Sequence, residues 1–347
     1  MNESEIVIFK HNTLLQSLVK LNKIKNYDDL TLFVEDENKK IIGSITDGDI
    51  RRSIIKSNNL NLEVGNVCNK NFFNIVDDNV YQNLEIFRDK GVKILPVLNK
   101  NGTLNRVLDL NKHKSILPLE CMIMAGGRGK RLSPLTDKIP KPMLTLGGKP
   151  IIEYNIDRLI SFGIKKIYIS IKYLGEQIQS YFGDGSSKGI QIEYVWEEKP
   201  LGTAGALSLL KNIKTENILL INSDLFTNAD FEQMFKSLKS NNADMVVAST
   251  KYKVNIPYAV FDNYQEKVLG FIEKPTYNYH SNAGIYIFDK KWISLIPKNS
   301  FFDITTLMDL IIKKNKKIIH EPILGYWIDI GSPIEYKNAS ELVKHFK

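Results

Sequence analysis

Three closely spaced glycines follow an apolar run near the middle of the chain. The run covers residues 121–125 and ends at Ala125, and Gly126, Gly127 and Gly129 come directly after it. Glycine has no side chain, so the backbone N–H groups of such a segment can approach the oxygens of a phosphate group closely. The pattern predicts a phosphate-binding loop that begins where a strand ends.

Two basic residues strengthen this prediction. The guanidinium of Arg131 can bind phosphate oxygens in a bidentate manner, and Lys141 adds a second positive charge. The two most familiar phosphate-binding motifs do not fit the segment. A P-loop requires serine or threonine after its lysine, but Lys130 is followed by Arg131. Leu132 occupies the position of the third spaced glycine in a dinucleotide-binding motif.

Two aspartates stand in contexts that suit a metal ion. Asp224 comes just after the apolar run 218–221, and Asp329 lies beside a turn at Gly331. Phosphate chemistry needs a hard cation to neutralise charge, and carboxylates are natural ligands of such a cation. A single aspartate at a strand end is more often a helix cap than a metal ligand. The prediction of a metal site therefore depends on both aspartates occurring in such sequence contexts.

The elements that must position these residues alternate along the chain. Helical segments such as residues 152–162, which have one apolar face and stop before Gly163, lie between strand-like segments. This alternation predicts a Rossmann-like, doubly wound α/β sheet in residues 120–347. Ligands bind such sheets at the carboxyl ends of the strands. The strand-like segments cover residues 121–125, 167–171, 190–194, 218–221 and 245–248.

The first 115 residues contain a repeat. Residues 32–38 lead to residues 43–50, and about sixty residues later 94–99 lead to 106–111. Each half has the pattern of a strand, a polar turn, a second strand and the polar start of a helix. Residues 80–89 have apolar side chains at helical spacing. We therefore expect a small α+β domain over residues 1–115 and a linker before residue 120.

The composition is that of a globular protein with an excess of positive charge. Of 347 residues, 43% are hydrophobic and 25% are charged, and the net charge is +8. Most of this excess lies beyond residue 115, which favours an anionic small molecule as the partner; no basic run interleaved with aromatic residues indicates nucleic acid. The chain has no apolar run of membrane-spanning length, no signal-peptide layout and only two cysteines, in different predicted domains. We therefore expect a cytoplasmic protein without a membrane partner.

The glycine-rich segment resembles the signature of the sugar-1-phosphate nucleotidyltransferases. The signature Gly-Gly-x-Gly-x-Arg-Leu-x-Pro-x-Thr occupies residues 126–136, and Pro-Lys-x-Met follows at residues 140–143. The resemblance continues through most of residues 120–347. It implies that the loop from Ala125 to Gly129 binds a nucleoside triphosphate.

The same resemblance assigns roles to the charged residues. It implies that Arg131, Lys141 and Asp224 act in catalysis, and that Asp224 and Asp329 bind Mg²⁺ as the cofactor. The family usually has glycine where this chain has Ser223, just before the first aspartate. Serine is small, so we expect the site to be kept.

Residues 197–205 are similar to the part of the family that contacts the nucleobase. The resemblance places Glu197 at the edge of the base, where a carboxylate can accept hydrogen bonds from both N1–H and N2–H₂ of guanine. This favours GTP, although other relatives with an acidic residue at this position use UTP. Gly202 would let the base lie against the backbone, and Thr203 would either contact the nucleotide or cap the helix that follows it.

A sugar-binding motif is also present by resemblance. Residues 271–275 read Phe-Ile-Glu-Lys-Pro, which implies that Glu273 accepts hydrogen bonds from sugar hydroxyls and that Lys274 holds the 1-phosphate. Asn282 is then a further sugar contact. The alternative is that Glu273 and Lys274 are simply exposed charged residues. The family usually has glycine where Ala259 stands, which leaves the sugar open.

The N-terminal repeat resembles a tandem CBS pair, most clearly at the Gly-x-Ile-Thr-x-x-Asp of residues 43–49. The hydroxyl of Thr46 and the carboxylate of Asp49 could bind a regulatory nucleotide at a helix start, or they could cap that helix. The second copy has Leu108 and Asn111 at the matching positions, so the pair predicts one nucleotide site rather than two. Such pairs tend to associate, which favours a homo-oligomer.

Taken together, the resemblance implies that a sugar 1-phosphate attacks the α-phosphorus of a nucleoside triphosphate and releases pyrophosphate. A CBS pair ahead of this domain is similar to guanylyltransferases that activate sugars for bacterial surface glycans. This implies GTP and α-D-glucosamine 1-phosphate of legionaminic acid biosynthesis as the substrates. The alternatives are a mannose- or heptose-1-phosphate guanylyltransferase, a uridylyltransferase and, from another class, a non-catalytic nucleotide-sensing subunit.

Overall fold

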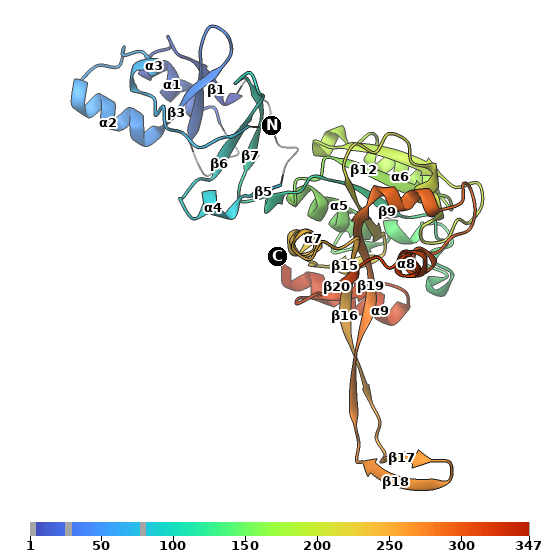
Figure 1. The fold of residues 1–347 in the computed structure, drawn as a ribbon. Helices are drawn as coiled ribbons and strands as arrows, with labels where there is room; N and C mark the ends of the chain where they lie inside the picture. Colours follow the sequence, from blue (N-terminus) through green and yellow to red (C-terminus); the bar gives the residue numbers. More distant parts are fainter. Residues whose placement is uncertain (1–4, 25–29, 77–80, 347) are drawn as a thin grey trace. The chain divides into compact units, whose positions relative to one another are not determined.

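The computed structural model describes residues 5–24, 30–76 and 81–346 (Figure 1). Contacts within the chain divide it into two compact units. Unit 1 consists of residues 1–118 and 161–163, and unit 2 consists of residues 119–160 and 164–347. None of the helices in the described ranges is long and apolar enough to span a membrane.

Unit 2 is built on a seven-stranded mixed sheet. In spatial order its strands are β13 (Gln191–Trp196), β12 (Lys166–Ile171), β9 (Leu119–Met124), β14 (Asn217–Asn222), β19 (Thr276–Asp289), β16 (Met245–Asn255) and β20 (Ile318–Pro322). The first four are parallel, β19 is antiparallel to both neighbours, and β16 and β20 are parallel to each other. The predicted α/β class and its strand-like segments are therefore confirmed.

The order of the parallel strands places a topological switch point in the sheet. From β9 the chain proceeds outward through β12 to β13, and then returns to the other side of β9 with β14. A crevice opens at such a reversal, beyond the carboxyl ends of the two central strands. The glycine-rich loop follows β9 and Asp224 follows β14, so the topology brings both to this crevice.

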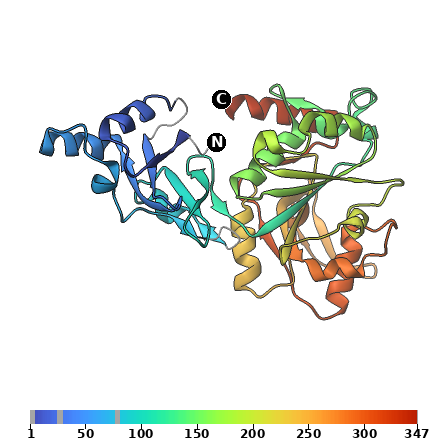
Figure 2. The same ribbon diagram turned by 90° about the horizontal axis from the view of Figure 1, so that it is seen from above.

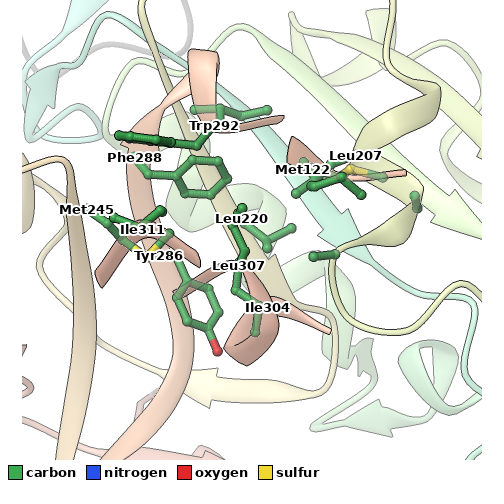
Figure 3. Close-up of a cluster of buried hydrophobic side chains, with 14 of the residues drawn as sticks. Met122, Leu207, Leu220, Met245, Tyr286, Phe288, Trp292, Ile304, Leu307 and Ile311 are labelled. Carbon is green, nitrogen blue, oxygen red and sulfur yellow. The ribbon is translucent and has the colours of Figure 1, made fainter. Parts of the chain in front are cut away.

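Helices cover both faces of the sheet (Figure 2). On one face, α8 (Ile304–Lys313) buries apolar residues spaced three and four apart, because that spacing forms one stripe of a helix. The stripe packs against inward-facing residues of the strands, which Figure 3 shows as a continuous cluster. The cluster includes Met122, Leu220, Met245, Tyr286, Phe288, Trp292, Ile304, Leu307 and Ile311.

The helix predicted over residues 152–162 is present as α5 (Ile151–Ser161). Two other helices begin at side-chain caps: Asp230 accepts a hydrogen bond at the start of α7 (Phe231–Ser240), and Ser332 does so at the start of α9 (Pro333–Val343). Besides short 3-10 helices, the remaining α-helix and strands of unit 2 are α6 (Gly175–Phe182), β10 (Thr145–Leu146), β11 (Lys149–Pro150), β15 (Leu225–Thr227), β17 (Val260–Tyr264), β18 (Lys267–Ile272) and β21 (Trp327–Asp329).

Unit 1 contains two related three-stranded sheets. The first comprises β1 (Val7–Phe9), β2 (Thr31–Glu35) and β3 (Ile41–Thr46), and the second comprises β4 (Ile75–Val76), β6 (Ile94–Leu98) and β7 (Leu104–Asp109). In each, one strand runs parallel to the first strand of an antiparallel hairpin. The other elements are α1 (Leu14–Leu21), α2 (Asp47–Ser57), α3 (Val64–Val67), α4 (Glu85–Arg88), β5 (Gln82–Asn83) and β8 (Ser115–Ile116).

The two halves of the repeat differ after the hairpin. The first half continues into α2, whereas β7 is followed by a turn, so the helix start expected at residues 106–111 is wrong. The reason is local: Thr46 and Asp49 form a capping box, whereas Leu108 is a buried strand residue and cannot cap. Of the helix expected over residues 80–89, only the four residues of α4 are helical; residues 77–80 lie outside the described ranges.

Strands β16 and β19 continue beyond the sheet as a long ribbon. Their register shifts between Val247 and Ser249, and they then pair without interruption from Ser249 and Asn282 to Asn255 and Thr276. Strands β17 and β18 extend this ribbon to a tight turn, and Figure 1 shows it projecting away from the sheet. Residues 250–281 are called the arm below.

Candidate active site

A cavity of about 490 Å³ lies at the carboxyl ends of β9 and β14. It occurs where the switch point of the sheet predicts a ligand. The residues that line it come from the glycine-rich loop, from the ends of both strands, and from the segments around residues 141, 200, 301 and 331. They are Met124, Gly126, Gly127, Gly129, Lys130, Arg131, Lys141, Pro142, Glu197, Pro200, Leu201, Gly202, Thr203, Asn222, Ser223, Asp224, Phe301 and Gly331.

The glycine-rich loop is fixed at its two ends. Ala125 is buried, and its N–H donates to the carbonyl of Ser170, 2.9 Å away. Gly129 has a φ of +66°, and a β-carbon on it would lie 2.9 Å from Cβ of Lys141. A β-carbon on Gly127 would meet nothing within 4 Å. The loop is thus tightly packed at Gly129 and open at Gly127, where a ligand can approach the backbone.

Glu197 is held at the inner wall of the cavity. Its side chain accepts hydrogen bonds from the hydroxyl of Ser170 and from the N–H of Leu201, which is 3.0 Å from Oε2. The residue is only 8% exposed. A β-carbon on Gly126 would lie 2.7 Å from Oε1, so the carboxylate can occupy this position only because residue 126 is glycine. A carboxylate offers about four acceptor sites, so two remain for a ligand.

Thr203 and Gly202 are held by the segment that precedes α8. The hydroxyl of Thr203 accepts a hydrogen bond from the N–H of Ile304 at 2.8 Å and donates to Asp303, so it caps α8. The segment that follows Thr203 is a 3-10 turn without a side-chain cap, so the expectation that Thr203 caps it is wrong. Gly202 has a φ of +74°, and a β-carbon there would lie 2.8 Å from both Oδ1 of Asp303 and the carbonyl oxygen of Phe302.

Lys141 and the two aspartates form one charged cluster. The ammonium group of Lys141 is buried and makes an ion pair with Oδ2 of Asp224, and it lies 3.9 Å from Oδ1 of Asp329. The aspartates are brought together by strands β15 and β21, in which Leu225 is paired with Asp329. The N–H of Ile330 also donates to the carbonyl of Asp224 at 3.0 Å.

The pKa of the Asp329 carboxyl group is shifted. Its pKa is raised above the usual value by burial and by the negative charge of Asp224, although Lys141 opposes this effect. Its Oδ1 atom is buried and has no hydrogen-bond partner among the described residues. Two neighbouring carboxylates with an unsatisfied oxygen suit a hard divalent cation. Within the described ranges, no group of three or more histidine, cysteine, aspartate or glutamate side chains is placed to hold a metal ion.

Arg131 lies at the edge of the cavity within a short 3-10 turn whose apolar residue, Leu132, is buried. A β-carbon on Gly331 would lie 2.9 Å from Nη2 of Arg131, so the turn after Asp329 lies directly against the guanidinium. The structure thus brings together Gly126, Gly127, Gly129, Arg131, Lys141, Glu197, Gly202, Thr203, Asp224 and Asp329, as the sequence predicts.

The expected sugar contacts lie elsewhere. Glu273 and Lys274 are exposed on the arm, and neither lines the cavity. Asn282, at the base of the arm, accepts hydrogen bonds from the N–H of Gly284 and the hydroxyl of Tyr286, both at 2.9 Å. Within one chain, the structure does not bring these three residues to the cavity.

The two candidate regulatory residues form a helix cap in unit 1. The N–H of Asp49 donates to the hydroxyl oxygen of Thr46, while the Asp49 carboxylate accepts from both the N–H and the hydroxyl of Thr46. Arg52 also donates to Asp49 at 2.6 Å. The capping role that the sequence allows is therefore present.

Several residues of the site are not predicted by the sequence motifs. Asn222 is the last residue of β14, and the position directly before Ser223 and Asp224 at a strand end could have identified it. Ser170 and Asp303 act by holding Glu197 and Thr203, and both lie far from their partners in the chain. Only the fold brings such pairs together.

Solved structures share the architecture of unit 2. A putative glucose-1-phosphate thymidylyltransferase from Bacillus anthracis is 24% identical, with a TM-score of 0.54, and the match covers 65% of this chain and 95% of that one, which shows the fold alone. HddC from Yersinia pseudotuberculosis, complexed with GMP-PN, is 28% identical, with a TM-score of 0.50, and covers 65% of this chain and 99% of that one.

Relatives by sequence match about two thirds of the chain. A D-glycero-alpha-D-manno-heptose 1-phosphate guanylyltransferase from Aneurinibacillus thermoaerophilus is 34% identical, over 66% of this chain and 100% of that protein. A mannose-1-phosphate guanylyltransferase from Mycobacterium tuberculosis is 31% identical over 65% of each protein, so the chain spans just under two thirds of that relative. The family model described as nucleotidyl transferase matches residues 120–345. The chain belongs to the nucleotidyl transferase family of enzymes.

Proposed function

We propose that this enzyme joins a sugar 1-phosphate to a nucleoside triphosphate and releases pyrophosphate. One observation carries the proposal: a glycine-rich loop, a buried lysine and two aspartates surround a single cavity at the switch point of the sheet. Backbone N–H groups and cations suit phosphates, and paired carboxylates suit the metal ion that accompanies a triphosphate.

The proposed reaction is an in-line displacement. An oxygen of the sugar 1-phosphate forms a bond to the α-phosphorus, the bond from the α-phosphorus to the bridging oxygen breaks, and pyrophosphate leaves. The attacking phosphate is already ionised at neutral pH, so no general base is needed. Arg131 and Lys141 contribute by positioning the phosphates and offsetting their negative charge.

Mg²⁺ is the proposed cofactor. Asp224 and Asp329 would hold it, and it would supply further charge neutralisation at the phosphates. The unsatisfied oxygen of Asp329 and the proximity of the two carboxylates support this assignment.

GTP is the proposed nucleotide. Glu197 lines the cavity with acceptor capacity to spare, which suits the two adjacent donors of guanine better than the single donor of uracil. The two relatives described above are named guanylyltransferases, and the HddC structure contains GMP-PN, which agrees with this choice. A uridylyltransferase is the alternative.

Three sugar 1-phosphates are candidates for the second substrate. α-D-Glucosamine 1-phosphate, the legionaminic acid precursor, rests on the resemblance of unit 1 to a CBS pair. Mannose and heptose 1-phosphates are named in the descriptions of the relatives. We propose glucosamine 1-phosphate as the first sugar to test and the other two as alternatives.

For unit 1 we propose a CBS-like module with at most one nucleotide site, at Thr46 and Asp49. The asymmetry between the halves supports this, because α2 has no counterpart after β7. The two residues already satisfy one another, so a nucleotide would have to share their hydrogen bonds.

A screen of pyrophosphate release tests the catalytic proposal. Four nucleoside triphosphates are combined with glucosamine, mannose and heptose 1-phosphates in the presence of Mg²⁺, and we expect the highest kcat/KM with GTP. Nucleotide binding without turnover for any pair would favour the non-catalytic sensing subunit and overturn the proposal.

A further inference from the structure

The arm exposes an unusual amount of apolar surface. Seven large side chains on it are between 59% and 75% exposed: Tyr252, Tyr258, Phe261, Tyr264, Leu269, Phe271 and Ile272. A two-stranded ribbon is marginally stable in water unless one of its faces is covered. Contiguous exposed apolar surface of this kind marks a binding surface.

Nothing in the described part of the chain covers this surface. The hydrophobic core clusters formed by the described residues contain no residue of the arm. The outer part of the arm forms hydrogen bonds within itself, such as those from the N–H of Ile256 to the carbonyl of Pro275 and from the hydroxyl of Thr276 to Asn255. The arm is therefore a folded ribbon whose exposed apolar side chains are not packed against the described hydrophobic core.

The arm also carries residues that the cavity lacks. Glu273 and Lys274 follow β18 directly, and none of the described residues that line the cavity belongs to the arm. Lys274 has a φ of +46° although it is not glycine and precedes proline, a combination that costs energy. The exposed ammonium group of Lys274 can donate hydrogen bonds to a phosphate, and the neighbouring carboxylate of Glu273 can accept hydrogen bonds from hydroxyl groups.

The base of the arm is well anchored, so its direction is set. Ser249 hydrogen-bonds to His320 at 2.9 Å, and the rings of His280 and His320 lie 4.7 Å apart. The N–H of Ile323 also donates to the carbonyl of Ser249 at 2.8 Å. These contacts join the ribbon to β20 and direct its continuation away from the sheet rather than back over the cavity.

We propose that two copies of this chain exchange their arms, so that Glu273 and Lys274 of each copy complete the cavity of the other. A second copy is the fitting partner for two reasons. It can cover the apolar side chains of the arm with its body, by which we mean unit 2 without the arm. It can also bring Glu273 and Lys274 to a cavity that has no residue of its own arm among its described lining residues. The proposal rests on the proposed function, since it takes the bound anion to be the sugar 1-phosphate.

Unit 2 also exposes apolar side chains outside the arm. Phe301 lines the cavity and is 64% exposed. Ile334, 73% exposed, is the second residue of α9 and follows Gly331 of the cavity wall by three positions, and Leu324, 96% exposed, precedes β21. Covering Tyr258 and Phe271 against such residues would remove apolar surface from water on both copies.

A heterodimer with one defect in each subunit tests the exchange. Asp224→Asn and Lys274→Ala chains carrying different tags are co-expressed, and the mixed dimer is isolated by two affinity steps. If arms are exchanged, one cavity combines an intact body with an intact arm, so we expect about half of the wild-type turnover per dimer. If each arm serves its own cavity, no site is intact and turnover stays at the level of the single variants, which overturns the proposal.

The matched control reverses the expectation. A heterodimer of wild-type chain with the Asp224→Asn, Lys274→Ala double variant has no intact site if arms are exchanged, and one intact site if they are not. A wild-type enzyme that turns over no substrate would refute the proposed function instead, and exchange would then be judged by photocrosslinking alone.

For that readout, benzoylphenylalanine replaces Phe271. Irradiation should yield a covalent dimer, whereas the same group at Tyr181, which is 53% exposed on α6, should not. Crosslinks that remain within one chain, or a monomeric wild-type protein, would contradict arm exchange.

Discussion

The ammonium group of Lys141 forms an ion pair with the carboxylate of Asp224, although the two residues are 83 positions apart in the chain. Lys141 is almost fully buried, so this pairing compensates for the loss of water around its charge. Oδ1 of Asp329 lies 3.9 Å from the same ammonium nitrogen. The lysine thus offsets the repulsion between the two carboxylates.

The first prediction concerns Asp224. Asp224→Asn should lower turnover by orders of magnitude, because one of the two carboxylates proposed to hold Mg²⁺ loses its charge. Pyrophosphate release measures turnover, and thermal melting checks that the fold remains. Asp230→Asn is the control: asparagine also caps a helix well, so α7 and activity should be kept. Near-normal turnover of the Asp224 variant would exclude the assignment.

The second prediction concerns base selection by Glu197. Glu197→Gln should lower kcat/KM for GTP relative to UTP by about 10- to 100-fold, the range expected for one hydrogen bond to a charged group. Glu198→Gln is the matched control, because Glu198 is exposed and does not line the cavity, so the ratio should not change. An unchanged ratio in the Glu197 variant would mean that another residue selects the base.

The third prediction separates two glycines of the phosphate loop. Gly129→Ala should destabilise the protein by about 1–3 kcal/mol, because the residue has a positive φ and its new β-carbon would meet Lys141. Gly127→Ala should change stability by no more than about 1 kcal/mol, since its β-carbon meets no protein atom. It should nevertheless raise KM for the triphosphate if a phosphate approaches there. Melting curves and steady-state kinetics together distinguish the two cases.

The fourth prediction follows from the raised pKa of Asp329. A carboxyl group whose pKa is higher in the folded state than in the unfolded state binds more protons when folded, so stability falls as pH rises through that interval. Asp329→Asn should therefore raise Tm at neutral pH without Mg²⁺, and the difference should vanish as the pH falls below the unfolded-state pKa. An equal difference at every pH would show that charge repulsion is not its cause.

The fifth prediction concerns unit 1. Isothermal titration of the full chain with adenine and guanine nucleotides, with and without Asp49→Ala, tests for the proposed single site. The variant should abolish binding at unit 1 and also cost about 1 kcal/mol of stability through loss of the helix cap. Asn111→Ala, at the matching place in the second half, should change neither. Two equivalent sites would contradict the asymmetry between the halves.

The sequence alone determined the features whose causes are local. The alternation of apolar segments indicated the α/β sheet, and α5 begins one residue from its expected start, because the apolar spacing and Gly163 set its limits. The glycines of the loop and the aspartates at strand ends were identified from their neighbours in the chain. Strand order then brings those ends together, as the switch-point rule requires.

Only the tertiary structure decided which partners these residues meet. Thr203 caps α8, a hundred residues away, rather than the segment that follows it, because α8 begins beside the cavity. Glu197 is oriented by Ser170 on a neighbouring strand. Glu273 and Lys274 lie on the arm because β16 and β19 continue to pair beyond the sheet. A sequence motif specifies the chemistry that a segment can perform, whereas long-range strand pairing determines where that segment lies.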